Sequence, residues 1–94
     1  MVEMNDIKIG DLVFLESGFK RIPYEKGSAP IYRWVVGSHG AIPVGKFTLN
    51  QSAIVLETST RVIEGNFTKT CYNILTDKGE SGWFCEGEKW LKNS

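Results

Sequence analysis

The stretch TKTCYNILTDKGESGWFCE, residues 68–86, decides the fold class of this chain. Two runs rich in β-branched and aromatic residues flank residues 77–79, Asp-Lys-Gly, which is typical of a hairpin whose type I turn ends on a left-handed glycine. A three-residue loop sets the register of the two strands, which places Tyr72 opposite Phe84, Asn73 opposite Trp83 and Cys71 opposite Cys85. The stretch therefore predicts an antiparallel hairpin with the apolar pair Tyr72 and Phe84 facing inward.

Outward from this hairpin, the chain alternates between extended runs and turn-rich connections. Further strands are predicted at about 11–16, 31–36, 52–62 and, after a 3₁₀ turn near 86–89, 90–92. Glycines and prolines concentrate in 17–30 and 37–45, and these residues favour turns and oppose helices. We expect a long loop or an irregular hairpin over 17–30, and mostly a connecting loop over 37–45. The pattern predicts five or six short strands and an all-β barrel or sandwich.

The size and charge of the chain exclude several classes of protein. With 94 residues, 41% of them hydrophobic, the chain has room for one core, and we expect a single domain spanning 1–94. Lys plus Arg balance Asp plus Glu at 11 each, which disfavours a general polyanion binder. Two cysteines, no signal-peptide pattern and no long apolar run predict a cytoplasmic protein that does not enter a membrane.

Three short motifs resemble the small SH3-like β-barrel proteins encoded by tailed bacteriophages. The motifs are Ile9-Gly10-Asp11-Leu12-Val13, Ser52-Ala53-Ile54-Val55-Leu56-Glu57 and Tyr72-Asn73-Ile74-Leu75 with Gly82-Trp83-Phe84, in the order that the phage proteins have. The resemblance implies an SH3-like barrel in which 9–16 and 52–92 build the fold. It also implies that 17–51 is an extended insertion, much longer than the first loop of the family. We expect this insertion to carry whatever is particular to the protein.

Patterns that would indicate catalysis or a cofactor are weak in this sequence. Residues 40–46 have the G-x-x-x-x-G-K spacing of a phosphate loop, but the required Ser or Thr does not follow, and we expect a plain turn-rich loop. Cys71 and Cys85 are interpreted as buried free thiols, with a cross-strand disulfide or a metal site shared with His39 as the alternatives. His39 has no nucleophile or carboxylate at a readable spacing. We therefore expect no enzyme, no cofactor and no metal.

Basic and aromatic residues alternate within the insertion and form the candidate binding site. Residues 17–56 hold five basic side chains against one acidic side chain. The candidate residues are Lys20, Arg21, Tyr24, Tyr32, Arg33, Trp34, Lys46 and Phe47. A face of this kind suits a peptide or a nucleic-acid strand, although Tyr32, Trp34 and Phe47 could equally close the barrel. The first hypothesis is a non-enzymatic phage accessory module that binds a host or phage protein. The alternative is a small barrel that binds nucleic acid.

Overall fold

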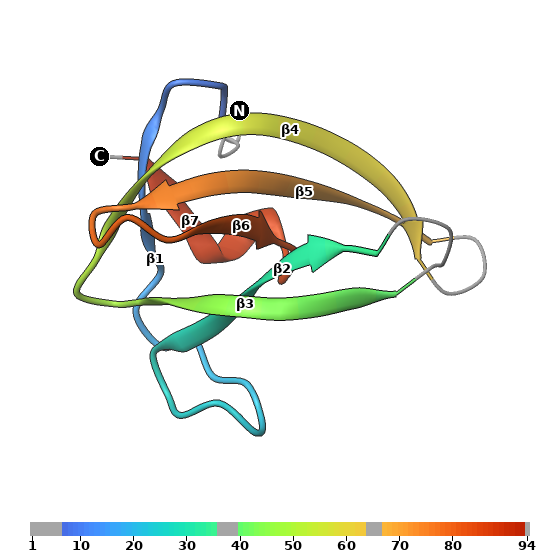
Figure 1. Ribbon diagram of the computed structural model, residues 1–94. Helices are drawn as coiled ribbons and strands as arrows, with labels where there is room; N and C mark the ends of the chain where they lie inside the picture. Colours follow the sequence, from blue (N-terminus) through green and yellow to red (C-terminus); the bar gives the residue numbers. More distant parts are fainter. Residues whose placement is uncertain (1–6, 36–39, 64–66, 94) are drawn as a thin grey trace, which may run out of the picture.

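Seven strands and one 3₁₀ turn occur in the computed structural model of the protein, which describes residues 7–35, 40–63 and 67–93 (Figure 1). The elements are β1 (Leu12–Leu15), β2 (Ser28–Trp34), β3 (Ala41–Thr48), β4 (Ser52–Ile63), β5 (Phe67–Thr76), β6 (Ser81–Phe84), η1 (Glu88–Trp90) and β7 (Leu91–Asn93). The strands form one antiparallel sheet in the order β3-β2-β6-β5-β4-β1-β7. The all-β class predicted from the sequence is confirmed.

The hairpin predicted at 68–86 is present with the predicted register. Tyr72 pairs with Phe84 and Asn73 pairs with Trp83, and the connecting turn ends on Gly79 at a φ of 87°. A side chain disfavours such a positive φ, which is why glycine occupies this position. The long strand predicted at 52–62 is also confirmed as β4, and η1 with β7 follows β6 within two residues of the predicted positions.

The predicted count of five or six strands is too low, because residues 37–45 were expected to be a loop. Ala41–Thr48 instead forms β3, which pairs with β2 and is the edge strand of the described sheet. An edge position tolerates Pro43, since a proline there removes no hydrogen bond from the sheet interior. The pairing of β2 with β3 is also irregular: its register shifts between Ile31 and Tyr32, as at a β-bulge.

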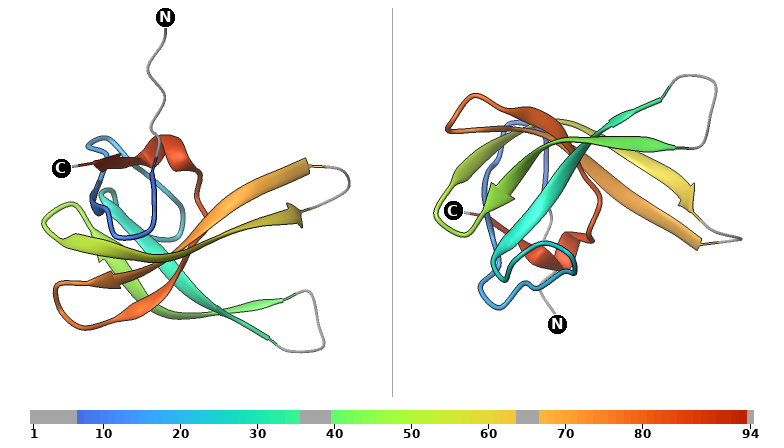
Figure 2. Two further views of the ribbon diagram at one scale, coloured as in Figure 1. Left: turned by 90° about the horizontal axis from the view of Figure 1, so that it is seen from above. Right: turned by 60° about the horizontal axis from the view of Figure 1, so that its bottom comes forward.

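Segment 17–51 is not an insertion outside the fold, and that prediction was wrong. It forms β2 and β3, and it supplies the buried side chains of Phe19, Ala29, Ile31 and Phe47 to the core. The Phe47 ring meets Phe84 edge-on at 6.3 Å between ring centroids, and Phe19 meets Trp90 in the same way at 5.1 Å. The sheet curls around this shared core (Figure 2), so both parts of the chain are needed to fill it.

The sheet divides where β6 ends. β6 has only four residues and pairs with β2 at one position, Tyr32 with Trp83. Beyond this point the β2–β3 hairpin and the β4–β5 hairpin diverge (Figure 2). The junction places side chains from β2, β3, β5 and β6 around one surface depression.

Candidate functional site

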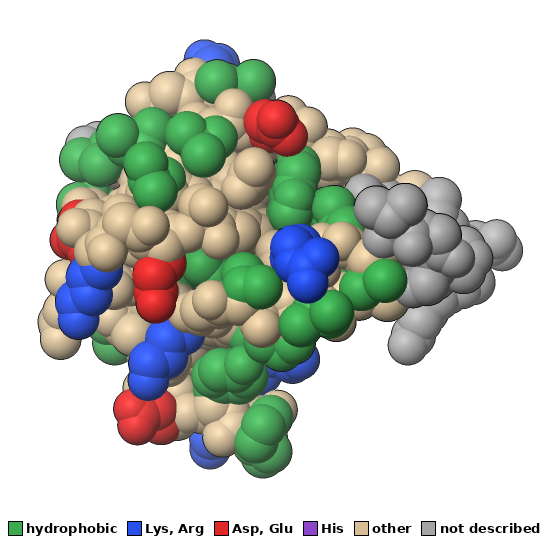
Figure 3. Space-filling model, viewed as in Figure 1, with side chains coloured by type: hydrophobic (Ala, Val, Ile, Leu, Met, Phe, Trp, Pro, Cys, Tyr) green, Lys and Arg blue, Asp and Glu red, His purple; other side chains and the backbone are tan. Residues whose placement is uncertain are grey.

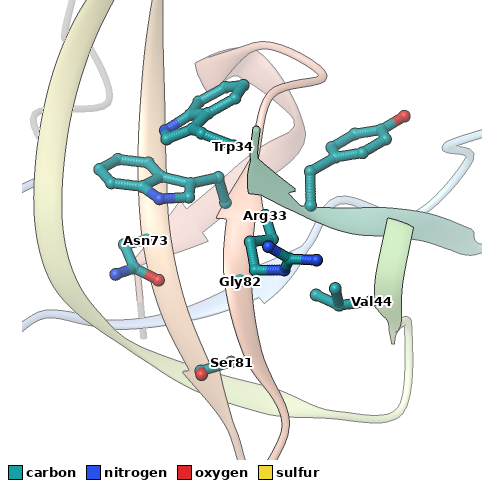
Figure 4. A pocket seen from close by; sticks show the side chains of 8 residues that line it. Arg33, Trp34, Val44, Asn73, Ser81 and Gly82 are labelled. Atoms are coloured by element: carbon teal, nitrogen blue, oxygen red, sulfur yellow. The ribbon is translucent and has the colours of Figure 1, made fainter. Parts of the chain in front are cut away.

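A groove of about 450 Å³ lies at the junction of four strands. Its lining residues are Tyr32, Arg33 and Trp34 of β2, Val44 of β3, Asn73 of β5, and Ser81, Gly82 and Trp83 of β6. Figure 4 shows Arg33, Val44 and Asn73 around Gly82, with Trp34 at one end of the groove and Ser81 at the other. The volume lies within the range of 300–1,000 Å³ that is typical of ligand pockets.

Two tryptophans form the aromatic end of the groove. The rings of Trp34 and Trp83 are 5.7 Å apart between centroids and inclined by 33°. Both residues are only partly buried, so part of each remains accessible beside the groove. Aromatic pairs of this geometry provide a large and rigid apolar surface, which loses little conformational entropy when a ligand covers it.

Arg33 is the charged residue of the groove lining. Its side chain is exposed, and it forms no ion pair with any residue in the described part of the chain. The guanidinium presents several donors in a planar fork that matches a carboxylate or a phosphate. The groove therefore combines an apolar end with a cation that has no partner within the described structure.

Arg21 has a different environment, because its guanidinium is held by two neighbours. Its Nη2 donates a hydrogen bond of 3.2 Å to the Tyr32 hydroxyl, and its Nε lies 3.4 Å from the Glu86 carboxylate. Burial lowers the pKa of Arg21, but the Tyr32 hydrogen bond and the Glu86 charge outweigh burial and raise it. Burial raises the pKa of Tyr32, and the hydrogen bond from Arg21 only partly opposes this shift. Arg21 thus holds Tyr32 in place and is less available to a ligand.

The other predicted site residues are separated from the groove. Lys20 is exposed in the loop before β2, Tyr24 is half-buried near the Arg21–Tyr32 pair, and Lys46 is exposed on β3. Phe47 is 0% exposed and belongs to the core, so a ligand cannot reach it. Of the predicted set, the structure brings only Tyr32, Arg33 and Trp34 together in the groove lining.

The β5–β6 hairpin contributes residues to the groove that were absent from the predicted site, including Asn73 and Trp83. Asn73 and Trp83 face each other across this hairpin, next to the inward-facing pair of Tyr72 and Phe84. Side chains alternate along a strand, so the predicted register already implied that Asn73 and Trp83 face outward. What the register could not indicate is that β2 pairs with β6 and brings Trp34 beside Trp83.

The patterns weighed for cofactor chemistry have a structural explanation. Residues 41–46 belong to β3, a strand that leads into a turn and then β4, which excludes the phosphate-loop arrangement. Cys71 is buried as predicted, Cys85 is only half-buried, and the two form no disulfide with each other. A hydrogen bond between the two thiols, together with burial, raises the pKa of Cys85. His39 lies outside the described residues. Among the described residues, no group of three or more His, Cys, Asp and Glu could hold a metal ion.

A search for membrane-spanning helices and a comparison with known proteins add no evidence about function. In residues 7–35, 40–63 and 67–93, no helix has the length and apolar character needed to cross a bilayer. Comparison of the chain with models of protein families, with curated proteins and with solved structures gives no match. The functional argument therefore depends on the geometry of the groove.

Proposed function

We propose that the protein is a small SH3-like barrel of the phage type that acts as a non-enzymatic interaction module and binds a segment of a partner protein in the groove. The observation that carries this proposal is the Trp34–Trp83 pair beside an exposed Arg33. Tryptophan and arginine are enriched among the residues that contribute most to protein interfaces. The assignment to this barrel family depends on the order of the three sequence motifs.

The shape of the groove also favours a protein segment over a compact small molecule. The groove is open and extends over four neighbouring strands, and most of its lining is apolar. An extended peptide fits such a surface because alternate side chains enter the groove while the peptide backbone remains partly in solvent. The partner is then a host or phage protein in the cytoplasm of the infected cell.

Site-specific photo-crosslinking tests the proposal. A photoreactive phenylalanine analogue replaces Val44, an exposed groove residue, or Ile22, which is 82% exposed and lies outside the groove lining. In extracts of infected host cells, we expect one crosslinked protein with the analogue at position 44 and none at position 22. Adding Trp34→Ala should abolish the crosslink. Equal crosslinking at both positions, or none, would contradict the proposal.

Nucleic-acid binding is the second candidate function, and the Trp34–Trp83 pair next to Arg33 is the observation that favours it. Aromatic side chains stack on unpaired bases, and basic groups contact the phosphates. Affinity for a single-stranded oligonucleotide should then fall steeply as salt is raised, because each phosphate contact releases counterions. Absence of binding at low salt would exclude this candidate.

A further inference from the structure

We propose that the groove recognises an extended acidic peptide, in which one Asp or Glu pairs with Arg33 while an adjacent apolar side chain packs against Trp34 and Trp83. This inference rests on the proposed function and names the chemistry of the partner segment. Its first support is charge: the groove lining includes Arg33 and no carboxylate, and Arg33 has no ion-pair partner in the described residues. A peptide carboxylate would provide the missing counter-charge.

Charges around the groove define which side of it receives the acidic residue. Lys46 is exposed on β3, but it pairs with Pro30, three residues before Arg33, and so lies outside the groove lining. Figure 3 shows Lys and Arg side chains at separate points on the face that carries β2 and β3. Glu57 pairs with Asn73 from β4, and so lies beyond the opposite wall. Glu80 lies beside Gly45 at the Ser81 end, about 3.1 Å from the position that a Cβ on Gly45 would take. An acidic side chain is therefore favoured beside Arg33 on β2, and it is disfavoured toward Glu57 on β4 and toward Glu80 at the Ser81 end.

Arginine suits this role better than lysine would. A guanidinium forms two parallel hydrogen bonds with one carboxylate, whereas an ammonium interacts as a point charge. An exposed ion pair contributes little affinity by itself, so the contact between Arg33 and a carboxylate chiefly selects for the acidic residue. Arg33 therefore provides specificity, and the tryptophan pair provides most of the apolar contact.

The groove also limits the length of the segment. A volume of about 450 Å³ accommodates the side chains of two or three residues. The Asn73 amide and the Ser81 hydroxyl are polar groups of the lining, and they are placed to bond the peptide main chain as it crosses β5 and β6. The recognised unit is then an acidic residue next to one or two apolar residues in an extended conformation.

Selection from a random peptide library tests this inference. Immobilised 12-residue peptides are screened with the wild-type protein, with Arg33→Glu and with the matched control Lys20→Glu, which makes the same charge change at an exposed residue outside the groove. Thermal unfolding establishes that each variant is folded. We expect wild-type selections enriched in Asp or Glu beside Trp, Leu or Pro, and Arg33→Glu selections enriched in Lys or Arg.

The affinity of each variant for one selected acidic peptide then distinguishes two claims: that the groove binds a peptide, and that Arg33 recognises an acidic residue in it. Fluorescence polarisation should show at least about tenfold weaker binding by Arg33→Glu and less than about twofold change in Lys20→Glu. Selected peptides without acidic enrichment, or equal binding by wild type and Arg33→Glu, would overturn the inference and leave the peptide-binding function standing. Failure to select any peptide, or binding of a single-stranded oligonucleotide in its place, would overturn both.

Discussion

Gly82 lies on β6 in close contact with β2. A Cβ at this position would lie 3.1 Å from the Ile31 Cβ and 3.1 Å from the Tyr32 carbonyl oxygen. Such distances are shorter than ordinary van der Waals contacts, and neither the branched Ile31 side chain nor the backbone of β2 yields easily. The single pairing between the two strands, and with it the position of Trp34 beside Trp83, depends on a residue without a side chain.

We expect Gly82→Ala to lower the free energy of unfolding by about 1–3 kcal/mol, the usual cost of inserting a methyl group into a packed region. Urea unfolding measures the loss. Ser81→Ala, an exposed neighbour on the same strand, is the control and should change stability by less than about 0.5 kcal/mol. A Gly82→Ala protein as stable as wild type would show that β6 and β2 are less closely packed than the structure indicates.

The β5–β6 hairpin is stabilised at its turn by one buried hydroxyl. Thr76 is 3% exposed, and its Oγ1 accepts hydrogen bonds from the backbone N–H groups of Lys78 and Glu80 at 3.3 and 3.2 Å. The backbone N–H of Thr76 in turn donates to the Glu80 carbonyl at 2.8 Å. These bonds close the three-residue loop and fix the register that places Trp83 opposite Asn73.

Replacing Thr76 by valine removes the hydroxyl and preserves the shape of the side chain. We expect a loss of about 0.5–1.5 kcal/mol in the free energy of unfolding, because the two N–H groups lose their acceptor and turn instead to water. Thr76→Ser retains the hydroxyl and should recover most of the hydrogen-bond contribution. Chemical denaturation of the two variants gives the comparison, and equal stabilities would show that the hydroxyl makes no net contribution to the turn.

At the scale of the whole molecule, the sheet and the core are shared between segment 17–51 and the rest of the chain. β1 and β4 are adjacent, with Phe14 paired to Ser52, so a short linker could join them without strain. The linker would nevertheless remove two of the seven described strands and the buried rings of Phe19 and Phe47. The segment is therefore needed for the strands and core side chains that it supplies, and not to connect β1 with β4.

We expect a chain in which a short Gly-Ser linker replaces 17–51 to lack a cooperative unfolding transition and dispersed amide resonances. Phe47→Ala removes one of these core rings and should lower the free energy of unfolding by about 3–5 kcal/mol. The neighbouring Lys46→Ala should change it by less than about 0.5 kcal/mol. A shortened chain that unfolds cooperatively would revive the interpretation of 17–51 as a dispensable insertion. Circular dichroism and NMR provide the measurements.

Local patterns in the sequence determined the all-β class, the β5–β6 hairpin with its register, and β4. Each depends on residues near one another in the chain, such as a turn glycine or an alternation of side chains. The same logic failed for β3, whose glycine and proline are tolerated only because the sheet leaves that strand at its edge.

The tertiary structure alone decided which aromatic residues are core and which are surface. Sequence alternation did not distinguish Phe47 from Trp34, because their exposure depends on what packs against β2 and β3 from other parts of the chain. Phe47 meets Phe84 within the core, whereas Trp34 meets Trp83 at the point where the sheet divides. Both contacts join residues more than 35 positions apart, and no local pattern encodes a pairing over such a distance.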